Sequence, residues 1–319
     1  MRRLPTRWLA CAFIGLAIVL SGCSAQPQSN GPPFAADASP SSPGPAAAQR
    51  SPEQAPPQSS LSRTTESTLS SADASAHDSA HSTSTVSTQL QQTLPLAQET
   101  RVPVLYYHSV MSQPGNELRM PPEQFEEQIR YLAEQGYHSI TSRELYSAFY
   151  GTGRLPTKPV LIQFDDGYRD NYTQALPILR KYGFVATVFV VSSFVDGDGY
   201  LTWVQLDELV RSGWEIGSHS VNHEHLAELD DTKLKFELTV AKQVLESRLN
   251  LDVVSLAYPF GNYNDKVIAG AEAAGYKIAF TTNRGWANSK VSPFTLNRIY
   301  CYANMGLTEF KRRLNDPNY

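Results

Sequence analysis

Residues 160–167, Val160-Leu161-Ile162-Gln163-Phe164-Asp165-Asp166-Gly167, join an apolar run to two adjacent carboxylates and a glycine. The run has the length and composition of a buried β-strand. Successive side chains of a strand point to opposite faces, so Asp165 and Asp166 are expected to face different partners. One would bind a cation and the other would reach a substrate or water. The alternative is a hairpin turn, for which Asp-Gly is a common signal.

Three histidines, His219, His223 and His225, fall within seven residues after a short predicted strand. The i, i+4 spacing of His219 and His223 would place both rings on one face of a helical turn, which suits two imidazoles on one metal ion. With Asp166 they form a set of two histidines and one carboxylate, whose open positions admit water. A metal bound there lowers the pKa of that water to about 7, and Asp165 could accept its proton. Zinc is the default metal, although cobalt, nickel or iron would also fit.

Short apolar runs alternate with helical patterns through the second part of the chain. We predict strands over residues 102–107, 160–164, 185–191, 215–218, 253–257 and 277–281. We predict helices over residues 121–135, 172–182, 203–211, 231–249 and 266–274. This alternation is typical of an α/β domain with parallel strands, in a barrel or a doubly wound sheet, over residues 101–319. In both architectures functional sites form at the carboxyl ends of the strands, where Asp165 and His219 are predicted to lie.

The first 23 residues have the organisation of a secretory signal. Three arginines precede an apolar run over residues 8–20, and Leu20-Ser21-Gly22-Cys23 follows. These last four residues resemble the lipobox of bacterial lipoproteins, which implies cleavage before Cys23 and attachment of lipid to its sulfur. The lipid would anchor the protein at a membrane surface, and Ser24 in the next position implies the outer membrane. An uncleaved anchor is the alternative, but the run is short for a transmembrane helix.

Residues 24–100 are predicted to be a disordered tether between the anchor and the folded domain. Of these 77 residues, 17 are Ser, 13 are Ala and 10 are Pro, and Phe34 is the only aromatic residue. Such a composition buries too little apolar area to offset the loss of chain entropy on folding. After removal of the signal and lipidation of Cys23, Cys301 is the only thiol left, and a buried structural role is expected for it.

The composition of the whole chain argues against nucleic acid as a partner. The sequence has 27 basic and 31 acidic residues, a net charge of -4 and no long run of Lys or Arg. We expect a monomer whose partners are a substrate and, through Cys23, a membrane.

The motifs that carry the predicted chemistry resemble those of NodB-type polysaccharide deacetylases, carbohydrate esterase family 4. Gln163-Phe164-Asp165-Asp166-Gly167 resembles the first motif, His219-Ser220-Val221-Asn222-His223 the second and Tyr258-Pro259-Phe260-Gly261 the third. Their order and spacing are also similar. The resemblance implies a distorted (β/α)7-type barrel and the removal of acetyl groups from N-acetylated, sometimes O-acetylated, sugars.

The resemblance assigns roles to the matching residues. Asp166, His219 and His223 would bind a divalent metal, and Asp165 would act as the general base. The metal and the backbone N–H of Phe260 would hold the oxyanion of the tetrahedral intermediate. One hydrogen-bond donor at such a position is worth about 3–4 kcal/mol.

Two positions depart from the family pattern. Ala257 stands where an arginine is common in the third motif, and the last motif lacks the histidine that usually acts as the general acid. We predict that Arg298 replaces the missing arginine and orients Asp165; a purely structural salt bridge is the alternative. His225, His108 or water would then supply the acid.

The first strand of the domain indicates the substrate. Val102-Pro103-Val104-Leu105-Tyr106-Tyr107-His108-Ser109 is similar to the strand of the subgroup that deacetylates poly-β-1,6-N-acetylglucosamine in biofilms, so this polymer is the predicted substrate. Peptidoglycan and chitooligosaccharides are alternative substrates, and a catalytically silent glycan-binding lipoprotein is the alternative of another class. Tyr258 and Trp286 are predicted to contact the sugar, Trp286 by stacking.

Overall fold

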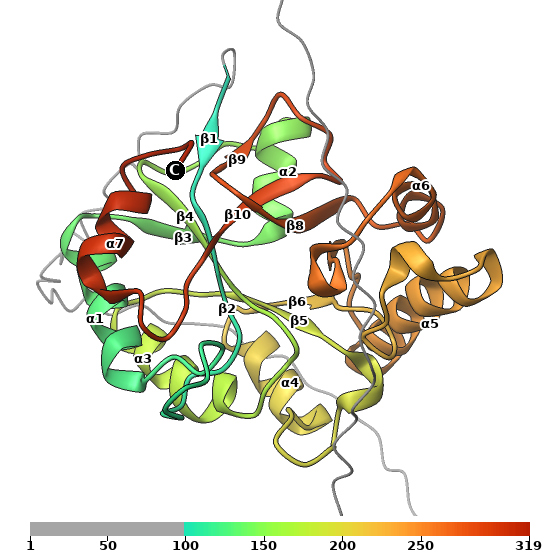
Figure 1. The fold of residues 1–319 in the computed structure, drawn as a ribbon, viewed down its shortest axis with the longest axis horizontal. Helices are drawn as coiled ribbons and strands as arrows, with labels where there is room; N and C mark the ends of the chain where they lie inside the picture. The colour runs from blue at the N-terminus through green and yellow to red at the C-terminus, as the bar shows by residue number, and fades with distance from the viewer. Residues whose placement is uncertain (1–98) are drawn as a thin grey trace, which may run out of the picture. The chain divides into compact units, whose positions relative to one another are not determined.

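The computed structural model describes residues 99–319 (Figure 1). The predicted signal over residues 1–23, its lipidation site Cys23 and residues 24–98 of the predicted tether lie outside the described residues. Within residues 99–319, no helix is both long enough and apolar enough to cross a lipid bilayer.

The described residues form ten strands and seven α-helices. The strands are β1 (Arg101–Val102), β2 (Val104–Tyr107), β3 (His138–Ile140), β4 (Pro159–Phe164), β5 (Thr187–Val190), β6 (Glu215–Ser218), β7 (Ser255–Ala257), β8 (Ile278–Arg284), β9 (Ala287–Asn288) and β10 (Leu296–Tyr300). The helices are α1 (Pro122–Glu134), α2 (Ser142–Tyr150), α3 (Leu176–Lys181), α4 (Trp203–Arg211), α5 (Asp231–Leu249), α6 (Asp265–Ala273) and α7 (Gly306–Arg313).

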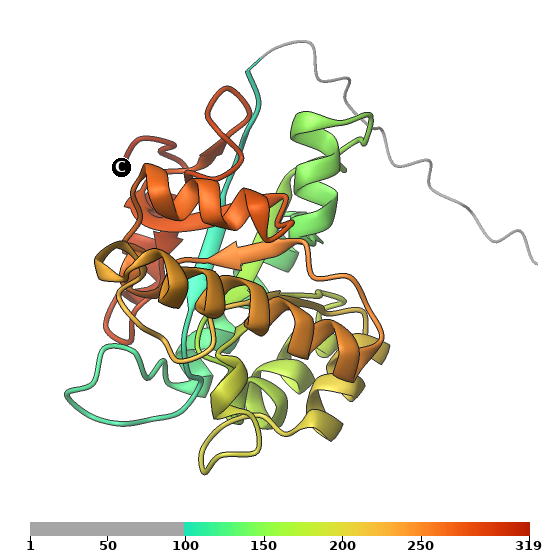
Figure 2. The same ribbon diagram turned by 90° about the vertical axis from the view of Figure 1, so that its right-hand side faces the viewer.

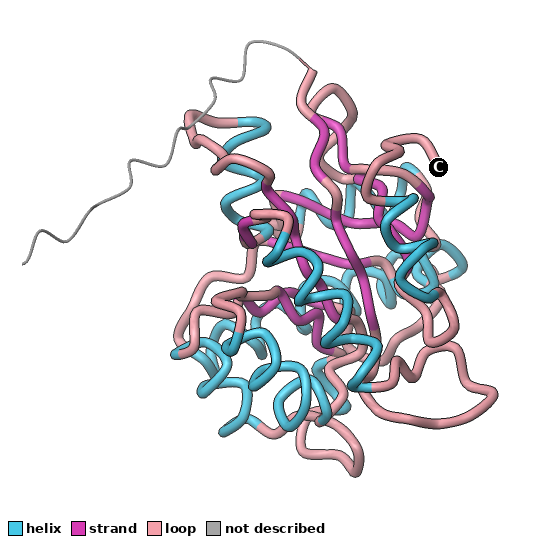
Figure 3. The backbone as a smooth tube through the Cα atoms, turned by 90° about the vertical axis from the view of Figure 1, so that its left-hand side faces the viewer, coloured by secondary structure: helices cyan, strands magenta, loops and turns pink. Residues whose placement is uncertain are grey.

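Seven of these strands close a barrel. Their order around it is β2, β10, β8, β7, β6, β5 and β4, and β4 pairs with β2 to complete the ring. Every pair in the ring is parallel. Figure 1 and Figure 2 show the helices around the barrel, and Figure 3 shows the strands at the centre of the fold. The predicted (β/α)7-type barrel is confirmed, and its parallel pairing excludes a hairpin at Asp-Gly.

The distortion of the barrel lies beside β4. The first half of β4 pairs with β3, whereas Gln163 and Phe164 in its second half pair with β5. β3 and β5 therefore follow one another along the same side of β4. The backbone N–H of Val185 donates a hydrogen bond to Ser139 Oγ at 2.9 Å, which joins the segment before β5 to β3.

The interior of the barrel is apolar at its amino end and polar at its carboxyl end. The apolar cluster includes Leu145 and Ala148 of α2, and this helix therefore covers the amino end. Strand residues of this cluster are Val104, Leu161, Phe189, Ile278, Phe280 and Leu296. Buried polar residues on or just after the strands include Gln163, Asp165, Thr187, His219, Thr281 and Arg298. Because side chains two residues apart share a face of a strand, Leu161, Gln163 and Asp165 form successive layers, and the layer nearest the carboxyl end is charged.

The helix predicted over residues 172–182 is present, but its first half is π-helical. The chain forms a π-helical turn over Asn171–Ala175 and only then continues as α3. Pro177 lies in the first turn of α3, directly after the π-helical turn that ends with the Leu176 N–H donating to the Asn171 carbonyl.

The sequence patterns did not predict β3, α2, β10 or α7. β10 was missed because Asn297 and Arg298 interrupt its apolar residues. A buried arginine is not expected in a strand unless a carboxylate pairs with it. The carboxylate that pairs with Arg298 is Asp165, 133 residues away in the chain. The local sequence pattern around Arg298 therefore does not predict a strand.

The loop after β6, which carries the predicted histidine ligands, is held by a buried carboxylate of α5. Glu237, only 3% exposed, accepts hydrogen bonds from the backbone N–H groups of Val221 at 2.9 Å and Asn222 at 2.8 Å. The side-chain amide of Asn222 donates a third bond to Glu237 at 2.6 Å. Because all three donors belong to Val221 and Asn222, which lie between His219 and His223, Glu237 fixes the path of this loop.

We expect Glu237→Ala to lower the free energy of unfolding by about 2–4 kcal/mol, because three donors lose one charged acceptor. Equilibrium unfolding in urea measures the change. Glu272→Ala, an exposed glutamate on the neighbouring helix α6, is the matched control and should stay within about 0.5 kcal/mol of the unmodified protein. Equal stability of the two variants would contradict the anchoring role of Glu237.

Candidate active site

Three ligand atoms converge at the carboxyl end of the barrel. Asp166 Oδ1 lies 3.4 Å from His219 Nε2 and 3.4 Å from His223 Nε2, and all three ligand atoms lie within 4.8 Å of one another. Tetrahedral zinc with bonds of about 2.0–2.1 Å holds its ligand atoms about 3.3–3.4 Å apart, which fits the first two separations. Asp166, His219 and His223, here called the triad, therefore have the donor atoms and the spacing of a divalent metal site.

The orientation of His219 is set by the backbone of β7. Its Nδ1 lies 2.7 Å from the carbonyl oxygen of Ala257, which can only accept, so Nδ1 carries the proton. In the neutral form of the ring, which a metal ligand requires, Nε2 is then unprotonated and faces Asp166. The two histidines hold the pKa of Asp166 well below its usual range, although burial alone would raise it.

The second histidine reaches the triad by a loop and not by a helical turn. The predicted helical turn between His219 and His223 is wrong: Ser220 and His223 have positive φ angles of 67° and 60°. The Ser220 hydroxyl oxygen accepts a hydrogen bond from the His223 N–H at 3.0 Å, which closes the loop and brings the two rings to 4.8 Å. Asp166 and Phe260 also have positive φ, and residues held in such conformations are concentrated at functional sites.

Asp165 and Asp166 are neighbours in the chain, but their side chains point in different directions. The Asp165 carboxylate points into the barrel, where it pairs with Arg298. The guanidinium donates two parallel hydrogen bonds to the carboxylate, NH1 to Oδ1 and NH2 to Oδ2, both at 2.8 Å. The Arg298 side chain is 0% exposed, and its Nε donates to the carbonyl of Thr281 at 2.8 Å. Burial raises the pKa of Asp165, but the charge of Arg298 outweighs it and the pKa lies below its usual range.

Two histidines stand near this pair, in different environments. His108 is partly buried: burial lowers its pKa against the attraction of Asp165 and Asp166, and its Nδ1 is buried without a hydrogen-bond partner among the described residues. His225 is exposed, and its ring stacks on Phe260 at 4.0 Å between centroids. Of the two acids considered from the sequence, the structure brings His108 to the paired carboxylates and leaves His225 at the rim.

Phe260 lies in a tight turn after β7. The residue has φ 58°, and its side chain is 52% exposed, in edge contact with His223. The turn is closed by the Gly261 N–H, which donates to the Tyr258 carbonyl at 2.8 Å. No backbone hydrogen bond between separate elements or in turns of the described residues is donated by the Phe260 N–H.

The two predicted sugar-contacting aromatic residues lie elsewhere. Tyr258 as a substrate contact is wrong: its side chain is 0% exposed, and its hydroxyl donates to the Phe294 carbonyl at 3.1 Å. Residues at the end of a barrel strand alternate between the interior and the surrounding helices, and Tyr258 faces the helices. The Trp286 indole N–H donates to the Arg313 carbonyl at 2.9 Å, so this ring holds the C-terminal segment, and its sugar stacking stays a prediction.

Cys301 has the buried environment expected for a structural thiol. Its side chain is 2% exposed, and burial raises its pKa to about 12. A thiol with such a pKa is protonated near neutral pH and is a poor nucleophile.

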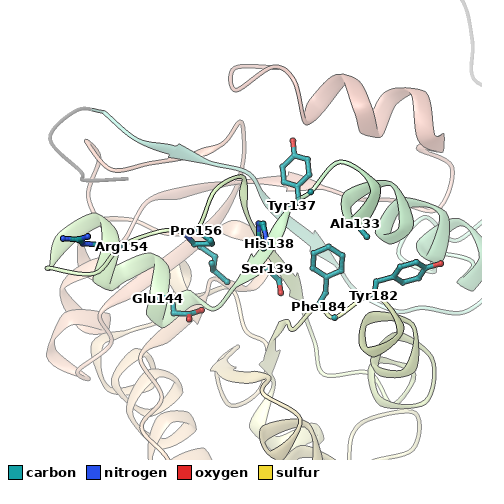
Figure 4. A pocket seen from close by; sticks show the side chains of 12 residues that line it. Ala133, Tyr137, His138, Ser139, Glu144, Arg154, Pro156, Tyr182 and Phe184 are labelled. Carbon is teal, nitrogen blue, oxygen red and sulfur yellow. The ribbon is translucent and has the colours of Figure 1, made fainter. Parts of the chain in front are cut away.

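A large cavity lies at the opposite end of the barrel from the triad (Figure 4). It has a volume of about 560 Å³, and Tyr137, His138, Glu144, Tyr182 and Phe184 are among the residues that line it. His138 pairs with the first residue of β4, whereas Asp165 follows the last. The cavity therefore shares no residue with the triad, and the chemistry of the triad does not extend to it.

The sequence analysis missed Glu237, which holds the loop before His223, and Tyr300, whose ring stacks on Tyr106. Glu237 carries no local signal because it lies on a different element from the loop it holds. Tyr300 follows Arg298 by two residues, and the alternation of a strand would have placed both on one face had β10 been predicted.

The domain that carries this site is similar to known proteins. The family described as polysaccharide deacetylase matches residues 152–279. The Bacillus subtilis protein YxkH, described by its name as a polysaccharide deacetylase, is 33% identical over 210 residues, which cover 66% of this chain and 75% of that protein. The Escherichia coli poly-β-1,6-N-acetyl-D-glucosamine N-deacetylase is 25% identical over 231 residues, and the match covers 59% of this chain but only 34% of that enzyme.

A solved structure supports the same grouping. The Streptococcus pyogenes deacetylase PplD, in complex with acetate, is similar with a TM-score of 0.65 and 29% identity, over 68% of this chain and 99% of that chain. Given this fold and the identity to YxkH over three quarters of that protein, this chain belongs to the polysaccharide deacetylase family.

Proposed function

We propose that this chain is a divalent-metal-dependent enzyme that removes N-acetyl groups from a polymer of N-acetylglucosamine. The observation that carries the proposal is the placement of two adjacent carboxylates in different roles. Asp166 joins two histidines in a set that fits a metal, while Asp165 is held beside it by Arg298. A site that only bound a glycan would have no need of an oriented second carboxylate.

The chemistry divides between the metal and the residues around it. When bound, the metal supplies a Lewis acid and lowers the pKa of water to about 7. Asp165 accepts the proton of the attacking water, and the two hydrogen bonds from Arg298 keep its carboxylate ionised and in one orientation. The backbone N–H of Phe260 donates to the oxyanion that forms on the acetyl carbon.

The leaving amine needs a proton, and His108 is the residue we propose to supply it. As the C–N bond of the acetamide breaks, a proton moves from His108 to the nitrogen, and the products are acetate and a free amine. The partly buried His108 interacts electrostatically with Asp165 and Asp166, whereas the exposed ring of His225 is stacked on Phe260. Asn171 holds His108 in place, since its side-chain amide donates to the His108 carbonyl at 2.8 Å.

The substrate we propose is poly-β-1,6-N-acetylglucosamine. Support comes from the similarity of residues 102–109 to that subgroup and from the name of the Escherichia coli relative, of which this chain spans about a third. We further propose that lipid on Cys23 anchors the enzyme to the outer membrane and that residues 24–98 tether the domain to it.

Loss of a triad ligand is expected to remove both the metal and the activity. Mutation of a residue that hydrogen-bonds to a metal ligand typically lowers metal affinity about 10–100-fold. His223→Gln removes a ligand itself, so it should lower metal affinity by at least that factor. Zinc content measured by mass spectrometry after dialysis, together with acetate release, tests this. His225→Gln is the matched control and should retain the metal. Full metal content in His223→Gln would contradict the triad.

Asp165→Asn should separate metal binding from turnover. The amide cannot accept a proton, so acetate release should fall about 10²–10⁴-fold, while the zinc content stays equal to that of the unmodified protein. Loss of the metal in this variant would show that Asp165 is a ligand and not the base. Arg298→Lys keeps the charge but not the paired hydrogen bonds, and an intermediate loss of activity is expected.

The choice of polymer is tested by acetate release from poly-β-1,6-N-acetylglucosamine, peptidoglycan and chitooligosaccharides. Release from the first at the highest kcat/KM, abolished by Asp165→Asn, is the expected result. A higher kcat/KM on peptidoglycan or on chitooligosaccharides would support the proposed deacetylation but contradict the proposed substrate. No release from any of them by the zinc-loaded protein would favour a silent glycan-binding lipoprotein.

A further inference from the structure

The hydroxyl of Tyr300 is buried and has no hydrogen-bond partner among the described residues. The same holds for Nδ1 of His108, whose ring meets that of Tyr300 edge-on at 6.0 Å between centroids. Buried polar groups in native proteins are nearly always paired, so two neighbouring exceptions mark a place where another molecule supplies the partner.

Tyr300 lies in the layer next to the ion pair. β10 and β2 run side by side with Tyr300 opposite Tyr106, and the two rings stack at 5.1 Å between centroids. The other neighbour of Tyr106 is Arg298, whose guanidinium carbon lies 4.1 Å from the ring centroid. Because alternate residues share a face of a strand, Tyr300 points into the barrel as Arg298 does, one layer closer to the carboxyl end.

The position of Tyr300 around the barrel separates it from the atoms that react. β2, which leads to His108, lies between β10 and β4, so around the ring Tyr300 and the triad ligand Asp166 stand on opposite sides of His108. In the proposed reaction the triad and the Phe260 N–H meet the acetyl group, and His108 meets the nitrogen. What extends beyond the nitrogen is the sugar ring, whose hydroxyl oxygens accept hydrogen bonds.

We propose that the Tyr300 hydroxyl donates a hydrogen bond to a hydroxyl of the sugar that loses its acetyl group. This inference rests on the proposed deacetylase function and adds a positioning residue for its substrate. Tyr300 holds the sugar so that the acetamide nitrogen stays against His108, and it takes no part in making or breaking a bond.

Tyr300→Phe removes one hydroxyl and leaves the ring stack in place. On β-1,6-linked N-acetylglucosamine oligomers we expect KM to rise about 3- to 10-fold, the effect of one hydrogen bond to substrate, with kcat changed less than about 2-fold. The Kd of the same oligomer, measured by calorimetry in proteins that also carry Asp165→Asn, should rise by a similar factor. Tyr302→Phe, on the segment that follows β10, is the matched control and should change neither constant.

Unchanged KM and Kd in Tyr300→Phe would overturn the inference. A fall in kcat at constant KM would also overturn it, because the hydroxyl would then act on His108 or the reacting atoms and not on the sugar. If the unmodified protein released no acetate, the proposed function would fail, yet the Kd comparison would still decide whether Tyr300 binds the sugar. An equal melting temperature of the three proteins excludes a general loss of structure.

Discussion

The buried ion pair between Asp165 and Arg298 is the interaction on which the rest of the site depends. It joins β4 to β10, whose positions in the ring are separated by β2, and it does so across the interior of the barrel. Two charges inside a protein are tolerated only when their hydrogen bonds are satisfied, and breaking such a pair costs about 3–5 kcal/mol. The donation from Arg298 Nε to the Thr281 carbonyl and the paired bonds to Asp165 meet this requirement.

The ion pair also explains why the two adjacent carboxylates differ. Asp165 continues the inward alternation of β4 and is turned into the barrel. Asp166 leaves the strand with φ 71°, which directs its carboxylate to the histidine loop. The positive φ of Asp166 therefore separates the two side chains: the Asp166 carboxylate faces the proposed cation site, and the Asp165 carboxylate is placed to accept a proton. Glu237, outside the barrel, also positions the site, because its carboxylate holds the loop on which His223 lies.

A parallel barrel concentrates these groups because all its strands end on the same side. His108 follows β2, Asp166 follows β4, His219 follows β6 and Phe260 follows β7. The apolar amino end is covered by α2, and the buried ionisable side chains of the interior, Asp165, His219 and Arg298, gather toward the carboxyl end. The stack of Arg298, Tyr106 and Tyr300 extends this layer from the ion pair toward the space where we propose that the sugar lies.

The sequence by itself determined the α/β class, most of the helices and strands, and the residues of the triad. These depend on periodicity and on short motifs, which are local properties of the chain. Only the tertiary structure decided that His219 and His223 meet through a loop, that Tyr258 faces the surrounding helices, and that β10 closes the barrel. The physical reason is distance along the chain: the Ala257 carbonyl that orients His219 lies 38 residues away from it, and the pairing of Arg298 with Asp165, 133 residues apart, was predicted only from the family resemblance. Which side chains a barrel brings together is set by the register and closure of its strands, and no local pattern records either.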